Sequence, residues 1–172
     1  MLKFVVKLMV VRLFVLVIFN FKNAKKIFSS SPLLLLLLLT SCQGTPPTNL
    51  GVHDNKLRPC PDKPNCVVSY DFGEQKNFIE PIKSEEEPGR IKEKILGIVS
   101  KDKSAKIVEQ NDTYLRAEYT SNLFKFVDDV EFWFGETGVV HFRSASRLGY
   151  SDLGANKDRI ETIRFKFHQN DF

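Results

Sequence analysis

A change in hydrophobic periodicity near residue 105 is the feature that most restricts the fold of this chain. From there to residue 147, apolar and polar side chains alternate, which is the pattern of half-buried β-strands. Short turn sequences divide this stretch into four predicted strands, at 105–110, 113–121, 124–134 and 139–147. Four consecutive strands joined by short turns predict an antiparallel meander.

Helical periodicity flanks the predicted strands. An isoleucine stripe at Ile91, Ile95 and Ile98 predicts a helix over 85–100, which Ser84 and Glu87 would begin with a capping box. A second apolar stripe predicts a helix over 156–168; it consists of Ile160, Ile163 and Phe167. A four-stranded antiparallel meander flanked by two helices is an α+β fold, a sandwich of two layers.

The composition fits one globular domain of 172 residues, with 42% apolar and 27% charged residues. The chain has 25 Lys and Arg against 21 Asp and Glu, but six of the basic residues and none of the acidic ones precede position 42. The rest carries 19 basic and 21 acidic residues, a net charge of −2. The basicity therefore belongs to the first 42 residues and gives no argument for nucleic-acid binding.

Residues 1–42 resemble a bacterial signal peptide. Scattered Lys and Arg residues precede seven consecutive leucines and a few small residues. The segment ends in Leu39-Thr40-Ser41-Cys42, which resembles a lipobox. In such signals the cysteine thiol receives a diacylglyceryl group and becomes the N-terminus, so the resemblance implies a periplasmic lipoprotein that carries fatty acyl chains such as palmitate. Gln43 resembles the second residue of lipoproteins sent to an outer membrane.

A second interpretation of this leader stays open. The apolar stretch from Phe4 to Phe21, interrupted by Lys7 and Arg12, could form a membrane helix, or residues 1–32 could precede the true start. Both interpretations place the rest of the chain outside the cytoplasm. Because residues 43–56 are polar and rich in Pro and Gly, we expect a flexible tether there, followed by a single domain at 57–172.

Cys60 and Cys66 remain once Cys42 is assigned to lipidation. Two prolines, an Asp and an Asn between the cysteines predict a tight turn that brings the cysteines within disulfide range. An exported protein also meets an oxidising compartment, which favours the bond. The alternative is one buried cysteine and one free thiol. The spacing does not fit a zinc knuckle, so no metal site is predicted.

Asp128 interrupts an apolar row on the third predicted strand. The side chains that share its face are Phe124, Phe126, Val130, Phe132 and Phe134. A buried carboxylate without a partner is costly. If Phe134 pairs with Val139, Arg143 is a diagonal neighbour of Asp128, and we predict an ion pair between them. A shift of the register by one residue would remove this pair.

Polar residues are dense between positions 143 and 159, where a predicted strand, a glycine-containing loop and a helix start follow one another. Together with the carboxylates of the third strand, the candidate residues are Asp128, Asp129, Glu131, Arg143, Ser144, Ser146, Arg147, Asp152, Asn156 and Arg159. These groups could cradle an anion. They could instead form an internal network, in which the arginines bind the carboxylates and Asp152 or Asn156 caps the helix. The near balance of charges favours the internal network.

Three segments carry a resemblance to a known family. They are Cys60-Pro61-Asp62-Lys63-Pro64-Asn65-Cys66-Val67-Val68-Ser69, Phe126-Val127-Asp128-Asp129-Val130-Glu131-Phe132 and Arg143-Ser144-Ala145-Ser146-Arg147-Leu148-Gly149-Tyr150-Ser151-Asp152-Leu153-Gly154-Ala155-Asn156, which Arg159-Ile160-Glu161 continues. They resemble the domain of unknown function 1499 (DUF1499) family over about residues 57–168. The resemblance implies an exported or membrane-linked α+β domain with no established reaction, and candidate rather than catalytic residues.

Common enzyme motifs do not occur in the sequence. We find no nucleophile elbow, phosphate-binding loop, dinucleotide fingerprint or zinc-protease helix, so no catalytic residue and no cofactor is predicted. Asp128 and Asp129 point to opposite faces of a strand and cannot act on one bond. Ser144 and Ser146 share a face that His141 does not, which argues against a serine hydrolase.

The sequence therefore predicts a lipid-anchored envelope protein that binds a small ligand, a lipid fragment or an envelope partner through residues 143–159 without catalysis. One alternative is an enzyme acting on an envelope substrate through Asp129, Glu131, Ser144 or Arg147, although Asp129 and Glu131 alone would make a weak cation site. Another is an assembly factor anchored by a membrane helix. An open pocket that carries these groups would favour the enzyme. Burial of the same groups in salt bridges would favour a structural role, and an exposed apolar patch would favour the assembly factor.

Overall fold

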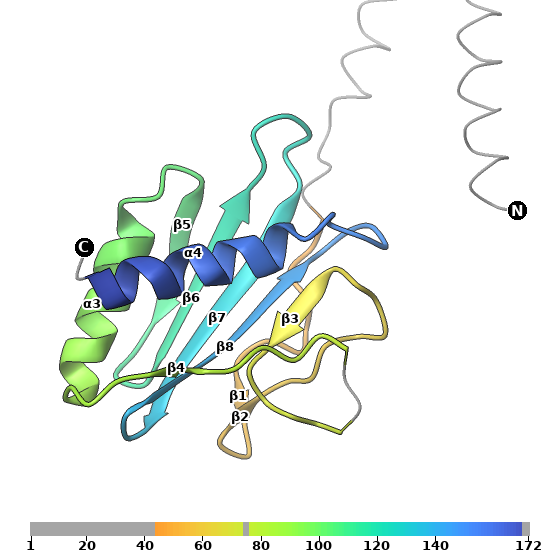
Figure 1. The fold of residues 1–172 in the computed structure, drawn as a ribbon. Helices are drawn as coiled ribbons and strands as arrows, with labels where there is room; N and C mark the ends of the chain where they lie inside the picture. Colours follow the sequence, from red (N-terminus) through yellow and green to blue (C-terminus); the bar gives the residue numbers. More distant parts are fainter. Residues whose placement is uncertain (1–43, 74–75, 170–172) are drawn as a thin grey trace, which may run out of the picture. The chain divides into compact units, whose positions relative to one another are not determined.

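The computed structural model describes residues 44–169 apart from residues 74–75. The lipobox with Cys42 and the apolar stretch from Phe4 to Phe21 lie outside the described residues. The elements, in chain order, are β1 (Val52–His53), β2 (Lys56–Leu57), β3 (Cys66–Val68), β4 (Ile82–Lys83), α3 (Pro88–Ser100), β5 (Ala105–Gln110), β6 (Tyr114–Thr120), β7 (Val127–Glu136), β8 (Val139–Ser146) and α4 (Ala155–Gln169) (Figure 1). Within this described part, no helix is both long enough and apolar enough to cross a membrane.

A six-stranded antiparallel sheet forms the centre of the fold. Strands β5, β6, β7 and β8 follow one another in the sheet, as the alternating pattern predicts. Both β3 and β4 pair with β8, so the sheet is larger than the predicted four-stranded meander. These added strands are three and two residues long, which is too short for alternation to be visible in the sequence.

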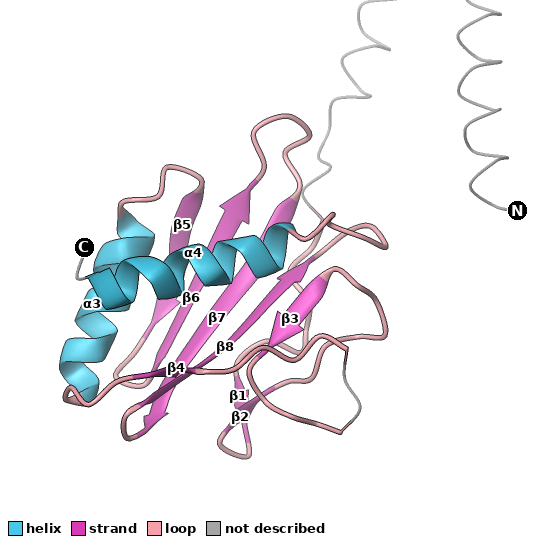
Figure 2. Ribbon diagram, viewed as in Figure 1, coloured by secondary structure: helices cyan, strands magenta, loops and turns pink. Residues whose placement is uncertain are grey.

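Both helices cover the same face of the sheet (Figure 2). Helix α4 matches the predicted range closely, whereas α3 begins only at Pro88, which fits the first turn because proline lacks an N–H. The predicted capping box does not form. Glu87 is the N-cap without a side-chain bond, and the Ser84 hydroxyl instead accepts a hydrogen bond of 3.2 Å from the Glu86 N–H.

The main core lies between the sheet and the two helices. Its fully buried side chains include Ile95, Leu115, Phe132, Phe142 and Ile160. A smaller apolar cluster occupies the opposite face of the sheet and consists of Leu57, Val68, Tyr70, Tyr114 and Trp133. The sheet is therefore covered on both faces, by helices on one and by an N-terminal segment on the other.

That N-terminal segment is the β1–β2 hairpin and the residues before it. Val52 packs against the smaller cluster, Leu57 is fully buried in it, and the Gly51 N–H donates a hydrogen bond of 2.7 Å to Glu131 Oε1. Residues 51–56, expected to belong to a flexible tether, thus lie on the sheet. Strands β1 and β2 have only two residues each, which is too short for alternation of apolar and polar side chains to predict them from the sequence.

The β7–β8 register differs from the predicted one by one residue. Strand β7 continues to Glu136, which pairs with Val139 across a tight turn in which Gly138 has φ +75°. The pairing of β7 with β8 is irregular between Trp133 and Glu136, and the register changes there. Glu131 is consequently opposite Arg143, and the predicted Asp128–Arg143 ion pair is wrong because these side chains point to opposite faces of the sheet.

Strand β7 also begins later than predicted. It starts at Val127, so Phe124 and Phe126 lie in the β6–β7 loop and are exposed rather than buried in a row with Asp128. Lys125 between them has φ +55°, a left-handed conformation that interrupts an extended strand.

Candidate functional site

The candidate polar residues separate into two networks on opposite faces of the sheet. The face covered by the helices carries Asp128, Ser144, Ser146, Asp152, Asn156 and Arg159. The other face carries Asp129, Glu131, Arg143 and Arg147. The alternation of side chains along β7 and β8 causes this division, so the ten residues do not converge on one site.

Arg159 links helix α4 to the sheet on the helix-covered face. Its Nη2 donates a hydrogen bond of 2.6 Å to Asp128 Oδ2, and its Nη1 lies 3.1 Å from the Ser144 hydroxyl. The guanidinium also lies over the Tyr119 ring, 4.6 Å from its centroid. Burial raises the pKa of Tyr119, and nearby Asp102 adds to this effect. Asp128, whose partner was predicted to be Arg143, is therefore neutralised by Arg159.

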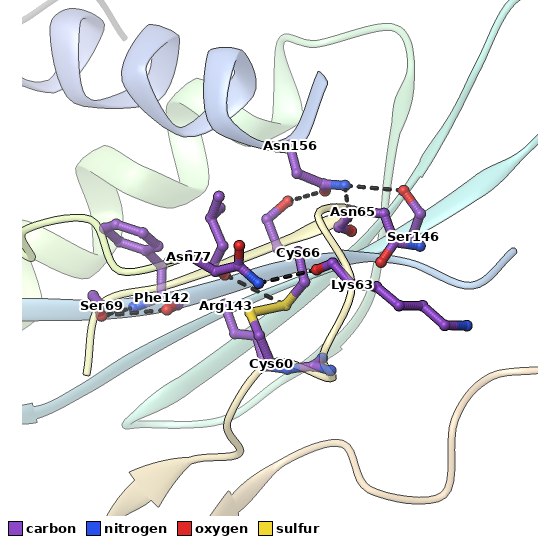
Figure 3. The surroundings of a disulfide bond; sticks show 12 residues. Cys60, Lys63, Asn65, Cys66, Ser69, Asn77, Phe142, Arg143, Ser146 and Asn156 are labelled. Carbon is purple, nitrogen blue, oxygen red and sulfur yellow. Dashed lines mark hydrogen bonds between the residues drawn. A yellow bond between two sulfur atoms is a disulfide. The ribbon is translucent and has the colours of Figure 1, made fainter. Parts of the chain in front are cut away.

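Asn156 is the hub of this network and is completely buried. Its side-chain Nδ2 lies within hydrogen-bond distance of the Asn65 carbonyl at 3.1 Å and of Ser146 Oγ at 2.9 Å (Figure 3). The same nitrogen lies 2.8 Å from Asp152 Oδ2. The Ser144 hydroxyl donates to its Oδ1 at 2.5 Å. Asn156 thus ties the start of α4 to β8 and to the loop before β3.

Asp152 holds the first turn of α4. One carboxylate oxygen accepts the N–H of Asn156 at 2.8 Å and the other accepts the N–H of Gly154 at 3.0 Å. Burial opposes ionisation of Asp152, but these backbone hydrogen bonds and the side-chain amide of Asn156 together lower its pKa below the ordinary value. The carboxylate is thereby held at the start of the helix.

On the opposite face, Arg147 and Asp129 form a two-pronged ion pair. Arg147 Nε and Nη2 donate to the two carboxylate oxygens of Asp129 at 2.7 and 2.8 Å, and Arg147 also binds Glu118. Arg116 reaches the same Asp129 at 3.1 Å. Hydrogen bonding to Asp129 is the largest effect that raises the pKa of Arg147, which stays charged. Arg147 is therefore held by two carboxylates, Asp129 and Glu118.

Glu131 and Arg143 form a second buried pair, with Oε2 and Nη1 3.1 Å apart and side-chain exposures of 1% and 3%. The other oxygen of Glu131 accepts hydrogen bonds from the Tyr114 hydroxyl at 2.9 Å and from the Gly51 N–H. Burial raises the pKa of Tyr114, and the negative charge of Glu131 adds to this effect. Glu131 therefore joins β6, β7, β8 and the N-terminal segment.

Arg116, Glu118 and Asn65 take part in these networks but were not among the predicted candidates. Arg116 and Glu118 lie on β6 directly opposite Glu131 and Asp129, so a search for charged partners across the predicted β6–β7 pair would have found them. Asn65 is buried and donates from Nδ2 to the Gly149 carbonyl at 3.0 Å. Its position between Pro64 and Cys66 gave no signal beyond the turn.

A serine, a histidine and a carboxylate also lie in a row at the β3–β8 edge. Ser69 Oγ lies 3.2 Å from His141 Nδ1, and His141 Nε2 lies 3.0 Å from Glu136 Oε2. Ser69 is only 3% exposed, and its hydroxyl accepts the Phe142 N–H at 2.8 Å. Tyr70 stacks on His141 with ring centroids 3.8 Å apart. A nucleophile needs access to substrate, so this row works as a packing contact.

The main cavities of the described chain avoid most of the candidate residues. One cavity, of about 590 Å³, lies between the β4 segment and the end of α4 and is lined by residues that include Glu86, Lys94 and His168. Arg159 borders a cavity of about 240 Å³, and Asp152 borders one of about 170 Å³. Among the described residues, no group of three or more His, Cys, Asp or Glu side chains is placed to hold a metal ion.

The predicted disulfide between Cys60 and Cys66 is present. The two Cα atoms are 5.7 Å apart, and the bond closes the loop that precedes β3 (Figure 3). Cys66 is buried and pairs with Ala145 of β8. The disulfide therefore fixes the loop that also carries Asn65.

Comparison with known proteins gives one family. Residues 56–167 match the family described as "Protein of unknown function (DUF1499)". A search of the curated proteins and a search of the solved structures each returned no match. The matched range begins at β2 and ends within α4, so it contains the ten candidate residues and the disulfide. The chain belongs to the DUF1499 family.

Proposed function

We propose that this protein is an exported envelope protein, anchored through a lipid on Cys42, which binds a small ligand or an envelope partner through residues 143–159 without catalysis. The sequence supports the anchor through the leucine-rich segment and Leu39-Thr40-Ser41-Cys42. The disulfide at Cys60–Cys66 fits an oxidising compartment outside the cytoplasm.

The pairing of the ionisable side chains is the observation that carries the non-catalytic part of the proposal. Asp129, Glu131 and Arg147 are each held by oppositely charged partners, and Ser144 is buried against Asn156. A general acid, base or nucleophile must reach the reacting atoms, and these groups face their partners instead. The networks serve to hold the β8–α4 loop, residues 147–154, in a fixed shape.

An assembly factor is the second candidate, and a specific observation favours it. The β8–α4 loop exposes Leu148, Tyr150 and Leu153. Asp152 of the same loop accepts the Asn156 N–H and so connects the loop to the Asn156 network. Exposed apolar side chains on a rigid base are typical of a surface that contacts a partner. Both candidates use the same loop, and they differ in whether a small molecule or a macromolecule covers it.

Intact mass of the full chain, expressed with its leader and extracted from membranes, tests the anchor. The expected product begins at Cys42, is heavier than the peptide by a diacylglyceryl group, and is two hydrogens lighter from the disulfide. A Cys42→Ser variant is the matched control and should keep its leader uncleaved and unmodified. An unmodified parent chain that retains residues 1–42 would contradict the lipid anchor and favour the membrane helix.

Native mass measurement of the same preparation tests ligand binding. A small molecule retained in the native spectrum and lost on denaturation supports the ligand, and its mass identifies the class. A bare mass in both spectra, together with co-purification of an envelope protein that a Leu148→Ser variant loses, supports the assembly factor. Turnover of an envelope substrate that an Arg147→Met variant abolishes while it remains folded would contradict the non-catalytic proposal.

A further inference from the structure

Large exposed apolar side chains gather at one end of the sheet. Among the described residues, six of the eight large exposed apolar side chains lie in two loops, with Leu123, Phe124 and Phe126 in the β6–β7 loop and Leu148, Tyr150 and Leu153 in the β8–α4 loop; the other two are Phe72 and Phe165. The two loops are neighbours because Thr120 pairs with Val127, and the Arg147 N–H donates to the Val127 carbonyl at 3.1 Å. Figure 1 shows both loops at the end of the sheet where the described chain begins. We call these six side chains the apolar end.

The β6–β7 loop is built to present its aromatic rings outward. The Ser121 N–H donates a hydrogen bond of 2.9 Å to the Phe126 carbonyl, and the Phe126 N–H donates one of 2.9 Å to the Ser121 hydroxyl. These two hydrogen bonds close the loop. Lys125 takes a left-handed conformation, and the rings of Phe124 and Phe126 lie 5.7 Å apart. Phe124 is 63% exposed and Leu123 is 79% exposed. The loop is therefore ordered and apolar, with a single positive charge between its rings.

Leu153 is the most informative residue of the β8–α4 loop. It is 95% exposed and has φ +58°, a conformation that costs a leucine about 1–2 kcal/mol and costs glycine little. Folding gains nothing from this side chain, because it contacts no core. A residue that is unfavourable for the backbone and useless for packing is expected where a function needs its side chain.

The described chain begins at this same end. A Cβ placed on Gly44 would lie 3.1 Å from Arg147 Cβ and 3.2 Å from Leu148 Cγ, so the backbone of Gly44 lies against the β8–α4 loop. Cys42 is two residues earlier in the chain. The attachment point of the proposed lipid is thus joined directly to the apolar end rather than to the opposite end of the sheet.

We propose that the apolar end inserts into the lipid bilayer to which the chain is anchored, as a second contact beside the lipid on Cys42. This inference rests on the proposed anchor. Leucine and phenylalanine enter the acyl region, tyrosine suits the headgroup level, and Lys125 suits anionic headgroups. Loop 121–126 contains no acidic residue, and the Asp152 carboxylate of the other loop is turned inward to α4.

Tryptophan variants of the full chain test the insertion. Phe124→Trp and Leu153→Trp place a fluorophore in each loop, and Phe165→Trp is the matched control because Phe165 is 64% exposed near the far end of α4. Each variant is reconstituted in vesicles of equal parts phosphatidylethanolamine and phosphatidylglycerol, with or without brominated acyl chains. The signal of the native Trp133 is subtracted with the parent chain. Flotation of the vesicles measures the anchor separately.

We expect the vesicles to carry all variants, the brominated lipid to quench the tryptophans at positions 124 and 153, and acrylamide to reach only the control. Flotation without quenching by brominated lipid overturns the insertion and leaves the anchor standing. If the two loop tryptophans are then shielded from acrylamide, a second copy of the chain covers the apolar end instead. If the protein does not float with the vesicles, the proposed lipid anchor is wrong, and the proposed insertion, which rests on that anchor, is wrong as well.

Discussion

Replacing Arg143 by methionine tests how the buried pairs hold the sheet. The substitution keeps most of the side-chain volume and removes the cation that faces Glu131 at 3.1 Å. Glu131 is then a buried carboxylate with two neutral donors left, the Tyr114 hydroxyl and the Gly51 N–H. Both members of the pair are nearly inaccessible to water, so solvent screening does not weaken the effect.

Removing one partner of a buried ion pair costs about 3–5 kcal/mol. Because two donors still serve Glu131, we expect the lower end of this range, about 3 kcal/mol. With a urea dependence of about 1.5 kcal/mol per molar, this loss lowers the unfolding midpoint by about 2 M. The double variant Arg143→Met/Glu131→Gln removes the stranded charge and keeps an oxygen for both donors, so it should be more stable than the single variant.

The assay is urea unfolding followed by the emission of Trp133, which is the only tryptophan of the chain and packs on the same face of the sheet. The parent and variants are kept oxidised so that the disulfide stays intact. Arg90→Met, which removes an exposed ion pair with Glu86 at 3.9 Å, is the control and should change stability by less than about 0.5 kcal/mol. An unchanged midpoint for Arg143→Met, or a double variant less stable than the single one, would refute the reasoning.

Three further predictions use the same unfolding measurement. Asn156→Ala should cost about 3 kcal/mol, because it strands buried polar groups at the start of α4; a loss below about 1 kcal/mol would contradict the role of the hub. Because the folded pKa of Asp152 is lowered, its contribution is complete above the ordinary pKa of an aspartate, about 3.9, and is lost as the pH falls below that value. Asp152→Asn should therefore lower stability near neutral pH and flatten the acid limb, and parallel curves for parent and variant would exclude this contribution. Reducing the Cys60–Cys66 bond, which closes a short loop of sequence separation 6, should cost about 2 kcal/mol by loop entropy, and an unchanged midpoint with reductant would show that the bond contributes nothing.

Periodicity predicted the long elements well because each repeats its pattern over enough residues. Strands β5 and β8 and helix α4 lie within one residue or so of their predicted bounds, since alternation and the isoleucine stripes are unambiguous there. Strands β1 to β4 have two or three residues each and depend on tertiary pairing with distant segments. Their existence is decided by packing, which a local pattern does not contain.

The partners of the charged residues could not be read from the sequence because they depend on strand register. A shift of one residue at the Gly138 turn moved Arg143 from the face of Asp128 to that of Glu131. The sequence did identify most of the polar residues that form the networks, although it missed Arg116, Glu118 and Asn65, since dense and balanced charge on strands must be mutually satisfied when buried. Alternation along the third strand already placed Asp128 and Asp129 on opposite faces, but the cross-strand partner of each group depended on the register.

The hairpin and Gly44 have a consequence for how far this domain extends from its attachment point. A free tether of residues 43–56 would have an average end-to-end distance of about 20 Å and a fully stretched length of about 50 Å, and these lengths would set how far the domain moves from the membrane. Since the chain is already docked at Gly44, only Gln43 separates the folded part from Cys42. A lipid on that cysteine would then hold the domain within about 8 Å of the bilayer surface. Its partners would have to come to the membrane, because the protein could not reach across the envelope to meet them.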